Sequence, residues 1–263
     1  MTDRAGRLIV AAALLFLLIV EHGRALGLLP GAAVVVVAIG IGVSALLART
    51  WSALHLGLFI LLAAAATVVP LQLLQVSTLQ LPLVFVLSLL LLWPLAQVRD
   101  SMRGWLRRGQ QDGISAFLTL GTPPLTGIAL ILWARWTDRI GVGEEMVQGL
   151  AEIPILVLVL VGLPVFALLN ALAEELLYRG LLQQALMEAL GDRPLLVVPL
   201  QASAFAALHY AVGFPNGALG YLMVFAWGCV LGVLRRRTGG LLAPFLVHVA
   251  ADLVIGGYLL SLL

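Results

Sequence analysis

The 263-residue chain has a single cysteine, no lysine and little charge of either sign. Charged residues make up 11% of it, whereas soluble globular proteins have about 25%. Such a chain cannot cover a water-facing surface with polar groups, which excludes a soluble domain. The lone thiol of Cys229 excludes a disulfide framework and any site built from several thiolates.

Apolar residues, in contrast, make up 62% of the chain. Crossing a bilayer takes about 20 such residues in a row. Candidate runs are 8–20, 28–48, 53–74, 79–98, 114–134, 153–187, 195–212, 217–234 and 240–262. The first run is short and follows Arg4 and Arg7, as in a signal peptide, but no small-residue cleavage site comes after it, so we expect an uncleaved anchor. The sequence therefore predicts an all-α, polytopic transmembrane helix bundle of about eight to nine spans.

The basic residues are all arginine and gather between the apolar runs. Arginine-rich short loops stay in the cytoplasm, so the pattern predicts a cytoplasmic N-terminus. The predicted inner face then collects Arg4, Arg7, Arg49, Arg99, Arg103, Arg107, Arg108, Arg193, Arg235, Arg236 and Arg237. The predicted outer loops hold Arg24, Arg135, Arg139, Asp138, Glu144, Glu145 and Glu152. This distribution indicates membrane topology, and we expect no nucleic-acid partner.

The chain divides into two parts of different character. Residues 1–152 keep their charges at the ends of the runs, and we predict N-terminal transmembrane scaffold helices and an outer loop there. Residues 153–263 carry ionisable residues inside the runs. We find no internal repeat, so a transporter built from inverted repeats gains no support. Gly228 and Gly232, spaced Gly-x-x-x-Gly, predict a close contact between two helices.

Three short motifs place polar side chains where lipid should reject them. Their members are Glu174, Glu175, Arg179, Phe205, His209, His248 and Asp252. An ionised group at the centre of a transmembrane helix costs about 2.5 to 3.5 kcal/mol, so these groups must face one another or water. At a helical rise of 1.5 Å per residue they lie about 12 to 24 Å from the predicted cytoplasmic ends. The three helices can therefore bring them to a common level.

Helical spacing indicates which side chains share a face. Glu175 and Arg179 are four residues apart and can form an ion pair, which we expect to be structural. Glu174 is then rotated by about 100° and is free to point elsewhere. Tyr178 lies one turn beyond Glu174, and either faces the same cavity or anchors the helix at the membrane interface. Carboxylates and imidazoles that meet in a low-dielectric hollow can make water nucleophilic.

The order Glu-Glu-x-x-x-Arg, Phe-x-x-x-His and His-x-x-x-Asp on successive hydrophobic helices resembles the CPBP family of intramembrane proteases. This family includes CaaX prenyl endopeptidases of the Rce1 type and bacterial Abi proteins. The likeness runs from about 153 to 262, so that 153–263 becomes a CPBP-like catalytic transmembrane core. Any one motif is weakly specific, whereas three in the right order on hydrophobic helices are strongly specific.

The resemblance implies a role for each residue. Glu174 would be the general base that activates a water, and His209 would hold that water and carry its proton to the leaving amine. His248 and Asp252 would stabilise the tetrahedral intermediate. Glu175 would belong to the same catalytic set, with Arg179 as its ion-pair partner. The cavity would be packed by Tyr178 and Phe205.

Asp252 departs from the family pattern, because the prenyl endopeptidases typically have Asn at this position. An ionised carboxylate repels an oxyanion, so Asp252 would either be protonated or orient His248 and support an imidazolium. Glu174, His209, His248 and Asp252 are also a possible zinc ligand set. The His-Glu-x-x-His pair of many zinc enzymes is absent. We therefore predict no cofactor and keep zinc as the alternative.

Taken together, the residues and the resemblance predict an intramembrane endopeptidase. Its partners would be a membrane-associated protein or peptide substrate and the lipid bilayer, and its location a multi-pass position in the bacterial cytoplasmic membrane. Two other classes stay open. One is a catalytically inactive membrane scaffold or immunity protein, and the other is a proton-coupled transporter in which Glu174 and Asp252 relay protons.

Overall fold

The computed structural model describes residues 3–66, 77–105, 107, 109–110, 112–137, 152–211 and 214–261. All regular structure in these ranges is helical, which confirms the predicted all-α class. Five of the described helices are long and apolar enough to cross a membrane, and four shorter apolar helices accompany them. The chain is therefore an integral membrane protein. The exact number of spans and the side of the N-terminus stay predictions.

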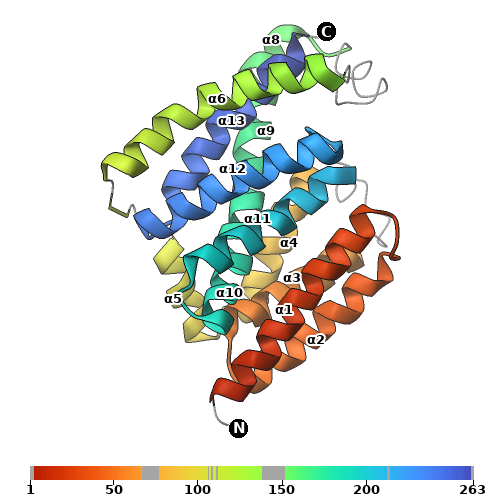
Figure 1. The fold of residues 1–263 in the computed structure, drawn as a ribbon, viewed down its shortest axis with the longest axis vertical. Helices are drawn as coiled ribbons and strands as arrows, with labels where there is room; N and C mark the ends of the chain where they lie inside the picture. Colours follow the sequence, from red (N-terminus) through yellow and green to blue (C-terminus); the bar gives the residue numbers. More distant parts are fainter. Residues whose placement is uncertain are drawn as a thin grey trace.

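The described residues of the N-terminal part form six helices. They are α1 (Asp3–Ala25), α2 (Ala32–Ala48), α3 (Trp51–Ala66), α4 (Ser77–Leu92), α5 (Ala96–Trp105) and α6 (Gly113–Thr137). α1 and α2 form an antiparallel pair along one side of the bundle, and α2 also packs on α3 (Figure 1). Part of the predicted run 53–74 and of the predicted outer loop, with Asp138, Arg139, Glu144 and Glu145, falls outside the described residues.

The predicted run 79–98 is wrong as a single span, since α4 ends at Leu92 and α5 begins at Ala96. Pro94 explains the break, because it lacks the N–H group that a continuous helix requires. Arg99 stabilises the turn by donating to the carbonyl oxygens of Trp93 at 2.6 Å and Pro94 at 2.9 Å. α5 is consequently a separate short helix.

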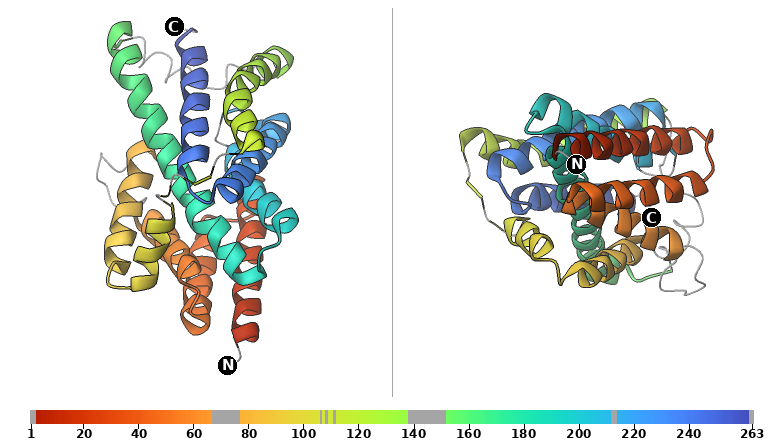
Figure 2. Two further views of the ribbon diagram at one scale, coloured as in Figure 1. Left: turned by 90° about the vertical axis from the view of Figure 1, so that its left-hand side faces the viewer. Right: turned by 90° about the horizontal axis from the view of Figure 1, so that it is seen from below.

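The C-terminal part begins with one long, continuous helical rod from Ile155 to Leu190. Its segments are α8 (Ile155–Val157), η2 (Leu158–Gly162), α9 (Leu163–Glu174), η3 (Glu175–Leu182) and α10 (Gln183–Leu190), of which η2 and η3 are π-helical. Three more helices follow, α11 (Pro194–Ala211), α12 (Gly217–Thr238) and α13 (Leu242–Leu260). The rod runs obliquely through the bundle, with the other helices around it (Figure 2). Short π-helical stretches are frequent at functional sites.

Small residues and buried amides bring α12 close to its neighbours. A Cβ atom on Gly228 would lie 3.0 Å from the Cβ of Ala202, which confirms the predicted close contact. Gln201 donates to the carbonyl oxygen of Gly228 at 2.8 Å, and Gln183 donates to that of Gly232 at 3.1 Å. Interhelical hydrogen bonds of this kind hold membrane helices together where apolar burial against lipid cannot.

The two parts of the chain pack into one bundle. α1 contacts α10 and α11, α3 contacts η3 and α10, α4 contacts α9, and α6 contacts α12 and α13. Glu188 on α10 accepts hydrogen bonds from the hydroxyl of Ser52 at 2.7 Å and from its backbone amide at 3.4 Å, and so caps the start of α3. That residues 1–152 serve as a scaffold and 153–263 as the catalytic part stays a prediction.

Candidate active site

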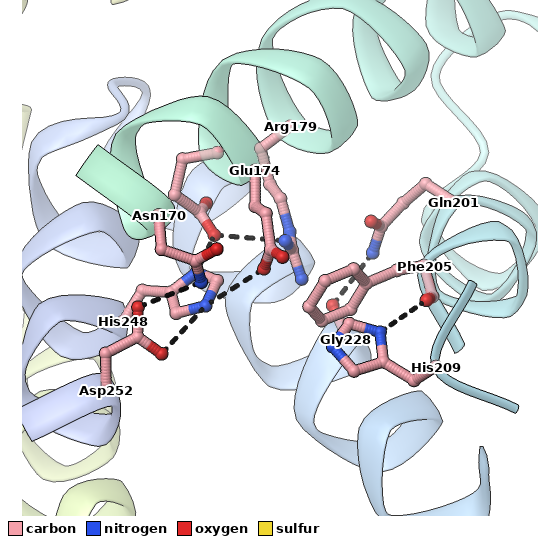
Figure 3. Close-up of polar contacts among 10 residues, drawn as sticks. Asn170, Glu174, Arg179, Gln201, Phe205, His209, Gly228, His248 and Asp252 are labelled. Atoms are coloured by element: carbon pink, nitrogen blue, oxygen red, sulfur yellow. Dashed lines mark hydrogen bonds and ion pairs between the residues drawn. The ribbon is translucent and has the colours of Figure 1, made fainter. Parts of the chain in front are cut away.

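The imidazole of His248 on α13 lies between two neighbouring glutamates, and Figure 3 shows it beside Glu174 and Asp252. Its Nδ1 donates to Glu175 Oε1 at 2.7 Å, and its Nε2 lies 3.3 Å from Glu174 Oε2. A third carboxylate oxygen, Asp252 Oδ1, lies 3.8 Å from the same Nε2. All four side chains are buried. The structure thus brings three acidic groups and one imidazole into a single cluster.

Glu174 and Glu175 are adjacent in the sequence, and yet both reach one imidazole. Glu174 ends α9 and Glu175 begins the π-helical η3, and both reach the ring of His248. The two nitrogens of an imidazole point in different directions, so one ring can meet two side chains that diverge around a helix. The π-helical turn that begins at Glu175 also changes the angular spacing of these side chains from that of an α-helix.

Arg179 neutralises part of this acidic charge. Its Nη1 donates to Glu175 Oε1 at 3.0 Å, with the arginine 0% and the glutamate 1% exposed. Glu175 Oε1 therefore accepts from Arg179 and from His248 together. The guanidinium carbon of Arg179 also lies 4.5 Å from the centre of the Phe205 ring, in cation–π geometry. A fully buried ion pair needs such additional contacts to offset the loss of hydration.

Asn170 also belongs to the cluster, although it is not part of the three sequence motifs. Its side-chain amide on α9 donates to Asp252 Oδ2 at 3.1 Å, joining α9 to α13 (Figure 3). The signal that could have found it is its position four residues before Glu174, as an amide in an otherwise apolar stretch. The bond fixes one oxygen of Asp252 and leaves the other beside His248. This arrangement agrees with a carboxylate that orients His248.

His209 on α11 stands apart from the acidic cluster. Its Nδ1 donates to the backbone carbonyl oxygen of Phe205 at 3.0 Å, and no hydrogen bond or ion pair links it to Glu174 in the described part of the chain. Because Nδ1 carries the proton, Nε2 of the neutral ring keeps its lone pair. The side chain is only partly buried, whereas Glu174 and His248 are buried.

Phe205 packs between His209 and the rest of the site. Its ring centre lies 4.8 Å from that of His209, 4.9 Å from that of Tyr178 and 6.1 Å from that of His248. Tyr178 is 7% exposed, so of its two possible positions the structure favours packing inside the bundle over an interfacial anchor. Phe205 thus packs against His209 on its own helix, α11, and links α11 to η3, which carries Arg179, and to α13, which carries His248.

The four possible metal ligands do not assemble into a ligand set. Across the described ranges, no group of three or more His, Cys, Asp or Glu side chains is arranged to hold a metal ion. The two nitrogens of His248 face Glu175 and Glu174, and His209 bonds back to its own helix. We derive no metal-dependent step from this geometry, and the absence of a cofactor stays a prediction.

Comparison with known families supports the motif-based assignment. Residues 156–254 match the model of the family described as type II CAAX prenyl endopeptidase Rce1-like. The matched range contains every catalytic candidate, from Glu174 to Asp252, and the resemblance inferred from the three motifs is confirmed. No curated protein and no solved structure matched the chain.

Proposed function

Because residues 156–254 match the model of the Rce1-like family of type II CAAX prenyl endopeptidases, we propose that the protein is an intramembrane endopeptidase that cleaves membrane-associated proteins. The observation that carries the proposal is the buried cluster of Glu174, Glu175, His248 and Asp252 within the matched range. The family implies a protein substrate at the bilayer. The location that we propose is the bacterial cytoplasmic membrane.

Glu174 is the better candidate of the two glutamates for general base. It is 8% exposed against 1% for Glu175, and only Glu175 is held by both Arg179 and His248. A base must reach the water whose proton it takes. In the proposed reaction Glu174 takes one proton from a water, and the resulting hydroxide attacks the carbonyl carbon of the scissile peptide bond.

His209 completes the proton path. Its Nδ1 is engaged with Phe205, so the lone pair of Nε2 can accept a hydrogen bond from the attacking water. After the attack, His209 Nε2 accepts the proton that Glu174 took and passes it to the nitrogen of the scissile bond. The bond between carbon and nitrogen then breaks, and the amine leaves with that proton. The products are a carboxylic acid and an amine, the acid then gives its proton to the amine or to water, and Glu174 is an anion again. General acid–base catalysis of this kind contributes about 10² to 10⁴ in rate.

His248 and Asp252 would act on the tetrahedral intermediate. When Glu174 is an anion, it attracts the Nε2–H of His248. Once Glu174 has taken a proton this attraction weakens, and the same N–H can donate to the oxyanion as negative charge develops there. Asp252, held by Asn170, would orient the ring and support its positive charge.

The proposal is tested by comparing membrane proteomes of cells that express the wild type, Glu174→Gln or His209→Gln, with mass spectrometry of protein C-termini. We expect shortened C-termini only with the active protein. Glu188→Gln is the matched control, because Glu188 lies on the same helical rod but bonds to Ser52 outside the cluster. Equal processing by wild type and both site variants, each purified as a folded protein, would reject the enzyme and favour the scaffold reading.

A further inference from the structure

A second polar feature lies at the arginine-rich end of the bundle. It is a cavity of about 200 Å³ between the end of the long rod, the turn after it and the end of α12. Its polar lining includes Arg179, Gln183, Asp192, Arg235 and Arg236. Sites for drug-sized ligands usually have about 300 to 1,000 Å³, so this cavity suits a smaller group.

The lining carries an excess of positive charge. Arg236 pairs with Asp192, and Arg179 pairs with Glu175 of the candidate active site. Arg235 has no acidic partner among the residues that the structure describes, and it is only partly exposed. An incompletely hydrated guanidinium inside a membrane protein is costly without a counter-charge. The cavity therefore favours an anion over a cation or a neutral ligand.

Several hydrogen-bond donors of the lining have no acceptor. Within the described ranges, Nε and Nη2 of Arg179 and Nε of Arg235 are buried and make no hydrogen bond. Arg179 is 0% exposed, whereas the side chain of Asp192 is 71% exposed, so the cavity leads from the surface to Arg179. Leaving a buried donor unpaired costs about 1 to 3 kcal/mol, and more for a charged group. The geometry of a guanidinium matches the oxygens of a phosphate.

We propose that this cavity binds a phosphate-type oxyanion, either the headgroup of an anionic lipid or free phosphate. Arg235 and Arg236 would meet the anion near the opening, and Arg179 would donate to it from the closed end. Basic pockets between transmembrane helices near a membrane surface suit lipid headgroups. Because Arg179 would then hold the anion and Glu175 together, the bound anion would lie one side chain from the candidate active site.

The test measures binding by the full-length protein, with two probes. The first is inorganic phosphate, titrated by calorimetry into protein in phosphatidylcholine nanodiscs. The second is phosphatidylglycerol, whose retention by the purified protein is measured by native mass spectrometry. The variants are Arg235→Gln and the matched control Arg237→Gln. Arg237 follows Arg235 by two residues on the same helix, but it pairs with Asp112 and does not line the cavity. We expect Arg235→Gln to weaken binding by about tenfold or more and Arg237→Gln to leave it unchanged.

The two probes separate the possible sources of the anion. Loss of phosphatidylglycerol from Arg235→Gln alone identifies a lipid headgroup, and loss of phosphate titration alone identifies the free ion. Equal binding of both probes by the two variants, or none by the wild type, overturns the proposal. If Arg235→Gln does not fold, Arg236→Gln replaces it. Glu174→Gln should bind the anion like the wild type, so the result does not depend on whether the protein cleaves peptides.

Discussion

Asn170 donates a hydrogen bond to Asp252 at 3.1 Å, from the middle of one membrane helix to another. Asp252 in turn places its second oxygen 3.8 Å from His248, which lies beside both glutamates. The amide thus acts on the site through a carboxylate, and within the described part of the chain its side chain makes no hydrogen bond to either glutamate. This makes Asn170 a positioning residue whose effect should differ from that of a catalytic group.

Replacing Asn170 by Ala should lower kcat by about tenfold or more while KM changes little, because Asp252 loses the donor that orients it. The measurement is steady-state cleavage of a peptide taken from a site found in the proteome comparison. Asn170→Gln tests for partial rescue, since it keeps the amide. A rise in KM of about tenfold with unchanged kcat would instead indicate a role in substrate binding.

Removing the guanidinium of Arg179 should destabilise the folded protein. Arg179→Met leaves Glu175 as a buried carboxylate without its ion-pair partner, which costs about 3 to 5 kcal/mol in comparable sites. We expect a destabilisation at the lower end of this range, because His248 still donates a hydrogen bond to Glu175. The free energy of unfolding is measured by denaturation in mixed micelles. The double variant Arg179→Met with Glu175→Gln should recover part of the loss, and no recovery would show that packing on Phe205 dominates.

A methyl group at Gly228 should disturb the contact between α11 and α12. Its Cβ would lie 3.0 Å from Ala202 and 3.3 Å from the ring of Phe205, and overpacking of this kind costs about 1 to 3 kcal/mol. Gly228→Ala should therefore lower the melting temperature and, through Phe205, the cleavage rate. Gly257→Ala is the control, because its added carbon meets no atom within 4 Å. Similar melting temperatures for the two variants would contradict the close approach.

Chelation should leave cleavage unchanged. The described side chains form no group of three or more ligands for a metal ion, and the proposed reaction uses only carboxylates and imidazoles. The purified protein is treated with a membrane-compatible chelator, and its zinc content is measured alongside its activity. Stoichiometric zinc, together with activity that chelation removes and zinc restores, would replace the glutamate-based mechanism with a metal-dependent one.

Acid should weaken the link between α6 and α12. Hydrogen bonds from the Arg237 side chain and from the Ser115 backbone hold the pKa of Asp112 below its ordinary value. A lowered folded-state pKa stabilises the protein above the ordinary aspartate pKa, and this contribution is lost as pH falls through the folded-state pKa. Asp112→Asn keeps the helix cap but removes the charge. The variant should melt below the wild type at pH 7, and the gap should narrow progressively as pH falls below the ordinary aspartate pKa toward the lowered pKa of Asp112. A gap that persists in acid would contradict the ionic origin.

Much of the fold follows from the sequence, because a chain with so little charge must satisfy its backbone within helices. The cluster was also predictable in outline, since ionisable groups in apolar runs have few alternatives to one another. The shared contact of Glu174 and Glu175 with His248 was not predictable, because it depends on where a π-helical turn falls. The bond from Asn170 to Asp252 joins residues 82 positions apart, and local spacing carries no information about it. The break at Pro94, however, had a visible cause.

The π-helical stretch Glu175–Leu182 makes the length of this part of the chain unusually important. Its hydrogen bonds span one residue more than those of an α-helix, so deleting one residue here would let the backbone relax to the common form. The two flanks would keep nearly the same relative orientation, because the wider turn holds one extra residue, but the side chains inside the stretch would shift around the helix. Arg179 and Gln183 would lose their present neighbours even though no side chain among them had been altered. Insertions and deletions in this stretch should therefore be far more damaging than most point substitutions.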